Sequence, residues 1–495
     1  MLSGEQCARL VESFTEADYS VEAVIGAVGA DAHRALSRNQ TVPADRALDG
    51  RFDPLATLIR LWLLQQPVPA GALDRALPGL RLALVRAGIL VEDGAEVRAV
   101  IDLRPYATED RGYWICADLT PGLDGVVHPT RPDLVLGASS ASTTLAQLTP
   151  RDPVTSALDL GTGCGVQSLH LAAHARSIVA TDVNPRAVQL AELTFLINSI
   201  EVDLRQGDLY APVAGQRFEL ITTNPPYVIA PPADGPRLTY RDAGLAADLL
   251  VERVVRAGTE HLIEGGLLCV LSNWAHRRGQ PWEDRLAGWI PAGCDAHVLQ
   301  RELLDPSEYA EIWLADAGLA GSPGYRRRYA GWLDYFDSLG IEAVGLGWLV
   351  VQRTGSERPV VRVEHWPHPV EQPVAAGLAR ERDGRRHDRD HDDQTLLAAR
   401  WLIGEDVVQE AIGPPGAADP AHLVLRQQRG LRRAVEVDTA LAGVVGACDG
   451  ELPLGVVVDA VAALLGVEPA ALRADVTPKF RRLVAEGYLI PAQQS

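Results

Sequence analysis

The sequence is poor in several features that would mark a specialised class of protein. Aromatic residues make up 5% of its 495 residues and methionine occurs once, whereas apolar residues reach 47%. No window holds the roughly 18 uncharged apolar residues that a membrane-spanning helix needs, and the N-terminus MLSGEQCARLVESF lacks the basic and apolar stretches of a signal peptide. We therefore expect a cytoplasmic globular protein of two to four domains, with no membrane partner.

Cysteine is scarce and scattered. The chain has six cysteines, none in a CxxC pair and none with histidines at zinc-ligand spacing: Cys7, Cys116, Cys164, Cys269, Cys294 and Cys448. This pattern predicts reduced, buried thiols and no metal site.

Positive charge is in deficit, with 46 Lys and Arg against 65 Asp and Glu and a net charge of -19. Such a surface repels phosphate backbones unless its basic residues gather on one face. The runs RRRYAGW (326–332) and LRQQRGLRR (425–433) are local candidates for such a face, although each is also typical of a solvated helix.

Both ends of the chain have helical patterns followed by β-strand patterns. In residues 1–103, the segment DPLATLIRLWLLQ is an apolar helix behind an Asp cap, and RAGILVEDGAEVRAVIDL is typical of a hairpin. Residues 401–495 again suggest three helices and a terminal strand. One of those helices has an apolar stripe that we expect in the core: Leu454, Val457, Val458, Val461, Leu464 and Leu465. We predict a winged-helix-like domain at each end.

Residues 104–354 alternate short β-rich runs with helical segments. Seven runs are strand candidates: TSALDLG, SIVATDV, VDLRQGD, FELITTNPPY, GGLLCVLSNW, DAHVLQREL and IEAVGLGWLVVQR. This alternation predicts an α/β fold, a doubly wound, seven-stranded, Rossmann-like parallel sheet. Residues 355–400 are rich in proline and then in charge, and we interpret them as a solvated linker; His387 and His391 then lie in a charged loop rather than in a metal site.

A glycine-rich turn follows the first of these strands. LDLGTGCG (158–165) places Gly161, Gly163 and Gly165 where backbone must approach a ligand closely, at the carboxyl end of the strand. A dinucleotide fingerprint would be GxGxxG, but residue 166 is Val. The pattern therefore favours S-adenosylmethionine over a nicotinamide or flavin cofactor.

Acidic residues follow the next two strands. Asp182 ends the second strand, 23 residues after Asp159, where its carboxylate can bind both ribose hydroxyls. Asp208 follows the third strand, where it can accept a hydrogen bond from the adenine amino group, with Leu209 beside the ring. A single glycine turn or aspartate is commonly only a tight connection or a cap, but their order and spacing together favour a cofactor site.

The fourth strand ends in the cassette Asn224, Pro225, Pro226 and Tyr227. With DLGTGCG, TDVN (which includes Val183 and Asn184) and GD at 207–208, this cassette resembles the class I methyltransferases that modify planar amino groups and carry a [ND]PP[YF] motif. These include the glutamine methyltransferases of release factors and the methyltransferases of adenine N6, cytosine N4 and guanine N2. The resemblance covers about residues 130–352.

The cassette suits a weak nucleophile, because an amide or ring amino nitrogen has its lone pair delocalised. The Asn224 side-chain oxygen and the Pro225 carbonyl can accept the two amino hydrogens and so align the nitrogen. Two prolines hold the turn rigid, and Tyr227 can stack on a planar target. A simple turn that caps a strand is the alternative.

Two loops complete the expected site. The resemblance implies that LVLGASSAST lies over the methionine end of the cofactor, with Gly137, Ala138 and Ser139 nearest, and that Arg241 and Asp242 help to order the acceptor. Plain loops with solvated charges explain both segments as well.

Three functions are compatible with these patterns. The first is an S-adenosylmethionine-dependent N-methyltransferase with a protein or peptide acceptor, such as a glutamine side chain, which the acidic composition favours. The second is a methyltransferase of RNA or DNA amino groups, which requires a basic groove. The third is a non-catalytic regulator that senses the cofactor, which would not need an amino clamp. The sequence does not indicate the oligomeric state.

Overall fold

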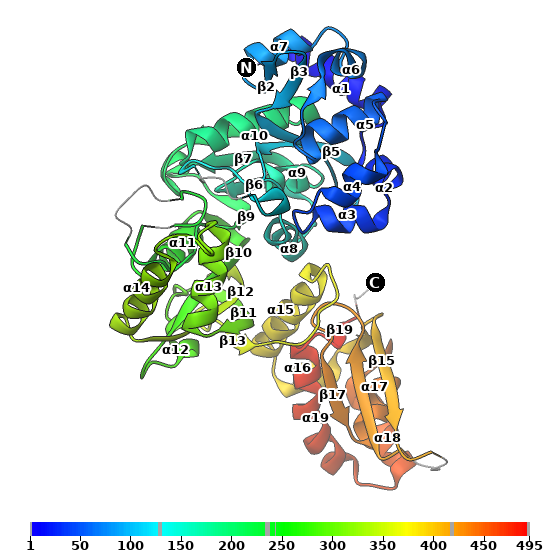
Figure 1. Ribbon diagram of the computed structural model, residues 1–495. Helices are drawn as coiled ribbons and strands as arrows, with labels where there is room; N and C mark the ends of the chain where they lie inside the picture. Colours follow the sequence, from blue (N-terminus) through cyan, green and yellow to red (C-terminus); the bar gives the residue numbers. More distant parts are fainter. Residues whose placement is uncertain (1, 127–130, 233–237, 243, 416–419, 493–495) are drawn as a thin grey trace. The chain divides into compact units, whose positions relative to one another are not determined.

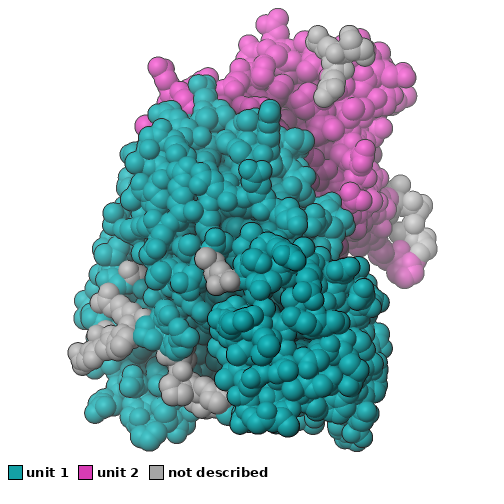
Figure 2. All heavy atoms as spheres, turned by 90° about the horizontal axis from the view of Figure 1, so that it is seen from above, with its two compact units in different colours: residues 1–146, 151–291, 298–354 teal, residues 147–150, 292–297, 355–495 magenta. Residues whose placement is uncertain are grey.

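The computed structural model describes residues 2–126, 131–232, 238–242, 244–415 and 420–492. The chain divides into two compact units, coloured separately in Figure 2. Unit 1 comprises residues 1–146, 151–291 and 298–354, and unit 2 comprises residues 147–150, 292–297 and 355–495. In the described ranges, no helix combines the length and apolar character needed to cross a bilayer. All six cysteines are buried thiols outside disulfide bonds, as predicted.

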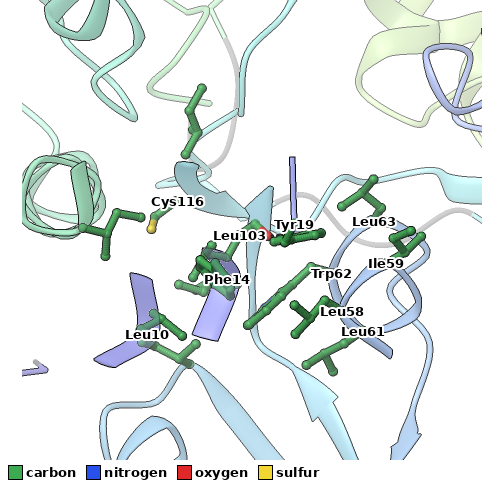
Figure 3. Packing of buried hydrophobic residues seen from close by; sticks show 14 of the residues in the cluster. Leu10, Phe14, Tyr19, Leu58, Ile59, Leu61, Trp62, Leu63, Leu103 and Cys116 are labelled. Carbon is green, nitrogen blue, oxygen red and sulfur yellow. Dashed lines mark hydrogen bonds between the residues drawn. The ribbon is translucent and has the colours of Figure 1, made fainter. Parts of the chain in front are cut away.

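Unit 1 begins with short helices. Their bounds are α1 (Gly4–Glu16), α2 (Val21–Val28), α3 (Ala30–Leu36), α4 (Val42–Ala47), α5 (Pro54–Leu58) and a π-helical turn at Ile59–Leu63. Ser3 and Gln6 form a capping box at the start of α1, and Asp53 caps α5. Buried aromatic side chains join these helices. The rings of Phe14 and Trp62 meet edge to face with their centroids 5.5 Å apart. Figure 3 shows both side chains among the apolar side chains around them.

The rest of the N-terminal region supplies two small sheets. Its elements are β1 (Val68–Pro69), α6 (Ala70–Ala76), α7 (Arg81–Arg86), β2 (Leu90–Asp93), β3 (Glu96–Ala99), β4 (Ile101–Ala107) and β5 (Gly112–Asp118). The predicted hairpin is present as β2 and β3, in a sheet of order β1-β3-β2. Strands β4 and β5 pair with each other, and the Cys116 N–H at the end of β5 donates to the Thr194 hydroxyl at 3.0 Å. The N-terminal region therefore lies in one compact unit with the central sheet.

The central sheet has eight strands in the order β13-β11-β12-β10-β9-β6-β7-β8 (Figure 1). Their bounds are β6 (Val154–Leu160), β7 (Ala175–Asp182), β8 (Asp203–Gln206), β9 (Phe218–Thr223), β10 (Leu262–Arg277), β11 (Cys294–Leu304), β12 (Ile341–Arg353) and β13 (Val361–His365). All seven predicted strands are present. From β6 the chain adds β7 and β8 on one side of the sheet and then crosses to add β9 on the other side of β6. The boundary between β6 and β9 is therefore the topological switch point of a doubly wound sheet.

Two expectations about the sheet need correction. Strand β12 runs antiparallel to β10, so the sheet is mixed rather than parallel. Strand β13 adds an eighth strand from the segment that the sequence suggested was a linker. Apolar alternation identifies a strand but carries no information on its direction, and β13 is short with half-buried residues.

Helices cover this sheet. They are α8 (Ser140–Leu148), α9 (Val166–Leu171), α10 (Pro185–Asn198), α11 (Leu249–Glu260), α12 (Trp282–Ala287), α13 (Pro306–Asp316) and α14 (Tyr325–Ser338), with 3-10 turns at Leu123–Gly125 and Ala211–Val213. Helices α9 and α10 contact the β6–β8 side, and α11, α13 and α14 contact β10 and β12. The pair α13 and α14 is inserted between β11 and β12, and its aromatic side chains pack on Val228 and Ile229, directly after the cassette.

Unit 2 contains the C-terminal elements. They are α15 (Ala375–Asp390), α16 (Asp393–Ala398), β14 (Arg400–Ile403), β15 (Val407–Ile412), β16 (His422–Gln427), β17 (Ala434–Val437), α17 (Thr439–Gly446), β18 (Asp449–Pro453), α18 (Leu454–Leu465), α19 (Pro469–Ala485) and β19 (Leu489–Pro491). The strands form two three-stranded sheets, β18-β14-β19 and β15-β16-β17. In the predicted stripe of α18, Leu454, Val457 and Val458 are buried, but Leu464 is 86% exposed because α18 ends at Gly466 beyond the core.

The segment 355–400 is not a solvated linker. Besides β13 it contains α15, which packs on α19 so closely that a Cβ on Gly384 would lie 1.9 Å from the Val484 carbonyl oxygen. His387 and His391 stack at 4.1 Å, and His387 meets the edge of the buried Trp401 ring. The high charge of this segment misled the prediction, because its charges are paired within the fold.

The strongest of these pairings is a buried cluster. Glu381, 2% exposed, accepts hydrogen bonds from Arg433 at 2.8 Å and from Arg385 at 3.0 Å. Arg433 also pairs with Glu364, which contacts His297 Nε2 at 2.7 Å. Although His297, Glu364 and Glu381 lie close enough together to ligate a metal, the two arginines neutralise both carboxylates, so we interpret the cluster as a structural ion-pair network.

Candidate active site

A cavity of about 400 Å³ opens at the carboxyl ends of β6, β7 and β9. This volume is in the range of small-molecule sites, and the position is the usual one for ligands of doubly wound sheets. Most of the predicted site residues line it: Ser139, Asp159, Gly161, Gly163, Asp182, Val183, Asn184, Asp208, Leu209, Asn224, Pro225 and Pro226. Ala138, Gly165 and Tyr227 are not among the lining residues.

The glycine turn leaves its first two glycines open toward the cavity. Gly161 and Gly163 have φ of +73° and +58°, and a Cβ on either would meet no atom within 4 Å. Gly165 has another role: its φ is +91° at the start of α9, and a Cβ there would lie 2.6 Å from the Phe195 ring. The third glycine thus allows α9 to pack closely, whereas the first two leave room for a ligand.

Two carboxylates, the buried Asp159 and the half-buried Asp182, hold this turn together. Asp159 Oδ2 accepts hydrogen bonds from the Thr162 hydroxyl and from the hydroxyl and N–H of Ser168, at 2.7 to 3.0 Å. Burial raises the pKa of Asp159 to about 6, against the opposing effect of these hydrogen bonds. Asp182 accepts from the Gly163 N–H at 2.9 Å and from the Asn184 N–H at 2.8 Å, and burial raises its pKa as well. Both carboxylates therefore fix the backbone around the cavity.

The segment after β8 completes this half of the cavity. Asp208 is exposed and lines the cavity next to Leu209, whose φ is +44°. The preceding Gly207 is constrained, because a Cβ there would lie 2.5 Å from the Pro212 ring. The tight turn thus directs Asp208 and Leu209 to the cavity.

The segment before α8 forms another wall of the cavity. Asp118 holds this segment in place, and the sequence did not predict that role. Leu134 to Gly137 line the cavity. Asp118, 7% exposed at the end of β5, accepts from the Val135 N–H at 2.9 Å and pairs with Arg186 at 2.7 Å. Asn184 Nδ2 donates to the Asp133 carbonyl at 3.0 Å. Asp118 has no motif around it, so only its place in the fold reveals this role.

The cassette places one polar atom in the cavity without a partner. The Thr223 hydroxyl before it donates to the Leu160 carbonyl at 2.8 Å, which ties the end of β9 to β6. Asn224 lines the cavity, and its Oδ1 is buried and accepts no hydrogen bond from any residue that the structure describes. Because a buried carbonyl oxygen without a donor is costly, this atom is suited to accept a hydrogen bond from a ligand.

Tyr227 does not have the predicted orientation. Its half-buried ring packs with α13, where it meets Trp313 at 6.3 Å with an interplanar angle of 74°. Burial raises the pKa of the Tyr227 hydroxyl. The ring therefore anchors the cassette to the inserted helices, and the stacking on a planar target that the sequence suggested is not available in this arrangement.

The two charged residues of the loop after the cassette form an ion pair, with Arg241 Nε 3.4 Å from Asp242 Oδ1, but they have different further partners. Arg241 points to α13, where it donates to the Trp313 carbonyl at 2.8 Å and to Asp316 at 3.0 Å. Asp242 lines the cavity together with Thr239 and Tyr240. Arg241 thus fastens the loop, whereas Asp242 faces the space beside Asn224. Residues 233–237 and 243 of the predicted gating loop lie outside the described residues.

Comparison with protein families identifies the central region. Residues 138–284 match the family described as "Methyltransferase small domain". Residues 16–100 and 385–491 match two families that are each described as a domain of unknown function, DUF7059 and DUF7782. The matched range of the methyltransferase family includes strands β6 to β10 and most of the cavity lining, so this part of the chain is similar to a methyltransferase domain, as the sequence motifs indicated.

Curated relatives resemble about a third of the chain. The chain is 36% identical over 175 residues to the ribosomal protein uL3 glutamine methyltransferase of Bradyrhizobium diazoefficiens, covering 33% of this chain and 51% of that protein. It is 32% identical over 164 residues to the release factor glutamine methyltransferase of Geobacter sulfurreducens, covering 30% and 55%. It is 30% identical over 180 residues to the ribosomal RNA small subunit methyltransferase C of Salmonella arizonae, covering 36% and 46%. The chain thus spans about half the length of these relatives.

Proposed function

We propose that the protein is an S-adenosylmethionine-dependent N-methyltransferase that acts on a planar amide or amino nitrogen. The observation that carries this proposal is the unpartnered, buried Oδ1 of Asn224 in the same cavity as Gly161, Gly163 and Asp182. A regulator that only senses the cofactor would not need a buried hydrogen-bond acceptor beside it.

The cavity residues fit this cofactor. The bare backbone at Gly161 and Gly163 leaves room for its methionine and ribose portions, and Asp182 can accept hydrogen bonds from ribose hydroxyls through lone pairs that its two backbone donors leave free. Val183 and Asn184 beside Asp182, and Asp208 and Leu209 across the cavity, would flank the adenosine. When bound, the cofactor supplies an electrophilic methyl group on a sulfonium.

The chain's own contribution to transfer is orientation. Asn224 Oδ1 and the Pro225 carbonyl accept the two hydrogens of the acceptor nitrogen, which directs its lone pair toward the methyl donor. The two prolines and the packing of Tyr227 on Trp313 keep this clamp in place. No charged donor is required, because the acceptor is neutral.

The acceptor that the cavity favours is a protein side-chain amide. The described residues that line the cavity include four aspartates and no Lys, Arg or His: the aspartates are Asp159, Asp182, Asp208 and Asp242. Such a wall repels the phosphates of a nucleotide substrate, whereas it accepts a neutral glutamine side chain. Two of the relatives described above are named glutamine methyltransferases.

Ribosomal RNA is the second candidate, because another relative is named a ribosomal RNA methyltransferase. Arg326, Arg327 and Arg328 are exposed at the start of α14, whose aromatic side chains pack beside the cassette. A nucleic-acid acceptor would have to gain its affinity from such residues outside the cavity.

For the flanking regions we propose winged-helix-like domains that contact the acceptor or other proteins. The order of elements from α5 through β1, α6, α7, β2 and β3, with the sheet order β1-β3-β2, supports this at the N-terminal end. At the C-terminal end, α17, β18, α18, α19 and β19 follow a similar order. The buried cysteines, none of which is in a disulfide bond among the described residues, support a reducing compartment such as the cytoplasm.

The proposal can be tested by labelling. The protein is incubated with methyl-labelled S-adenosylmethionine and a cell lysate, and the products are then treated with protease or with nuclease. We expect macromolecular label that protease releases and nuclease does not. Label that only nuclease releases would select the RNA alternative, and an absence of transfer with intact cofactor binding would refute the enzymatic function.

A further inference from the structure

Transfer of a methyl group to an amide nitrogen leaves a proton to be removed, and the clamp cannot take it. The alkylated nitrogen is cationic and acidic until it loses its hydrogen. The amide oxygen of Asn224 and the carbonyl oxygen of Pro225 accept hydrogen bonds but are very weak bases. Another group near the cassette must therefore receive the proton, or it must pass directly to water.

Asp242 is a carboxylate beside the cassette. The Val228 N–H donates to the Arg241 carbonyl at 2.9 Å, and Val228 and Asp242 form an isolated parallel bridge. This pairing fixes Asp242 next to Val228, the residue directly after the cassette, and Asp242 and Asn224 line the same cavity.

The Asp242 carboxylate has one oxygen available. Its Oδ2 accepts from the Leu238 N–H at 3.3 Å, whereas its Oδ1 is buried, has no hydrogen-bond partner among the described residues and lies 3.4 Å from Arg241 Nε in an ion pair. The side chain is only 16% exposed. Arg241 balances the charge of the carboxylate, but Oδ1 keeps lone pairs that no hydrogen bond from the described residues uses, so this oxygen is suited to a ligand that supplies a hydrogen.

The other cavity carboxylates are less suited to this role. Asp159 accepts three hydrogen bonds from the glycine-turn region, and both oxygens of Asp182 accept backbone N–H groups. Asp208 follows β8, which is separated from β9 by β7 and β6 in the sheet. Of these four aspartates, Asp242 is the one that the backbone pairs with the cassette segment.

The loop that carries Asp242 is anchored from behind. Arg241 is 8% exposed, bonds to the Trp313 carbonyl and Asp316, and lies over the Trp313 ring at 5.8 Å. Tyr240 donates its hydroxyl to Asp316 at 2.8 Å. Because its two preceding residues are held by α13, Asp242 is fixed in position rather than free to turn into solvent.

We infer that Asp242 is the proton acceptor of the reaction. As the bond between the methyl carbon and sulfur breaks and the bond between nitrogen and carbon forms, the nitrogen loses one hydrogen as a proton to Asp242 Oδ1. The resulting carboxylic acid returns that proton to water after product release. This inference rests on the proposed N-methylation and adds a catalytic residue to it.

The test compares Asp242→Asn with the intact chain. The probe is nuclease-treated lysate protein with methyl-labelled cofactor, and the initial rate of label incorporation is measured at saturating and limiting lysate concentrations. We expect the rate at saturation to fall roughly 100-fold. The dissociation constant of S-adenosylmethionine, measured by calorimetry, should change less than about twofold. The thermal unfolding midpoint should stay the same within the error of measurement.

Two further variants separate proton transfer from loop order. Asp316→Asn weakens the anchor of the same loop but leaves the cavity carboxylate, so it should lower the rate much less than Asp242→Asn. Added formate should restore part of the activity of Asp242→Ala, because a small carboxylate can occupy the space left by the side chain. An equal loss in Asp316→Asn, or no rescue by formate, would overturn the inference.

The outcome also distinguishes this inference from the proposed function. If the intact chain transfers no methyl group, N-methylation itself is refuted. If the intact chain is active and Asp242→Asn is equally active, the proton-acceptor role alone is wrong.

Discussion

The two halves of the cavity differ in how their polar groups are satisfied. On the cofactor side, Asp159 and Asp182 accept hydrogen bonds from the protein's own backbone and hydroxyls. On the proposed acceptor side, Asn224 Oδ1 and Asp242 Oδ1 are buried and have no such bonds from the described residues. We expect the first half to be rigid without a ligand, and we expect the polar atoms of the second half to find their partners in the molecule that binds there. Substitutions in the two halves should therefore have different effects.

The largest expected effect is on the acceptor side. Asn224→Ala should lower methyl transfer on the order of 1000-fold, because the acceptor nitrogen loses its orienting hydrogen bond. The dissociation constant for S-adenosylmethionine, measured by calorimetry, should change less than about twofold. Asn224→Asp is the matched control and should retain part of the activity, since it keeps an acceptor oxygen. Unchanged turnover in the alanine variant would contradict the clamp.

The next effect concerns the stability of the cofactor side. The pKa of Asp159 is raised from 3.8 to about 6, so the folded chain holds this proton more tightly than the unfolded chain. Its stabilising contribution is full below pH 3.8 and is lost as the pH rises through about 6. Denaturant titrations between pH 4 and 7 should show the intact chain losing about 3 kcal/mol relative to Asp159→Asn. If the free energy of unfolding of the two chains changed with pH in parallel, burial would not be the dominant influence on the pKa of Asp159.

A smaller effect is expected for cofactor affinity. Asp182→Ala should weaken S-adenosylmethionine binding roughly 30-fold for two reasons. The turn loses the carboxylate that accepts hydrogen bonds from the Gly163 and Asn184 N–H groups, and the ribose hydroxyls lose their proposed hydrogen-bond acceptor. Asp203→Ala is the control on the neighbouring strand, where an exposed carboxylate pairs with Arg205. Equal weakening of S-adenosylmethionine binding by both variants would indicate a general effect of removing a negative charge, rather than a specific contact of Asp182 with the cofactor.

The smallest effect distinguishes the glycines of the turn. Gly165→Ala should destabilise the fold by about 1 kcal/mol more than Gly215→Ala in thermal or denaturant unfolding. Both positions have positive φ, but only the Cβ at position 165 would collide with Phe195, whereas position 215 is open. If the two substitutions cost the same, the contact of Gly165 with Phe195 does not limit the packing of α9.

Local pattern was enough to predict most of the residues that line the cavity. The strand before Gly161, the aspartates after the strands and the cassette all follow from short stretches of sequence, and the cavity brings them together. The orientation of Tyr227 was predicted wrongly, because it depends on Trp313 in an insertion that lies far along the chain. The segment 355–400 was misjudged for a related reason: its charges find partners such as Arg433 that are distant in sequence.

The sequence by itself determined the order of strands and helices, the glycine turn and the residue types at each strand end, because these depend on neighbours a few positions apart. Only the tertiary structure decided which polar atoms are left without partners. Whether Asn224 Oδ1 or Asp242 Oδ1 meets a donor depends on segments that fold together from 100 or more residues. Hydrogen bonding and burial depend on that three-dimensional arrangement, so the polar atoms without partners on the acceptor side can be identified only from the folded structure.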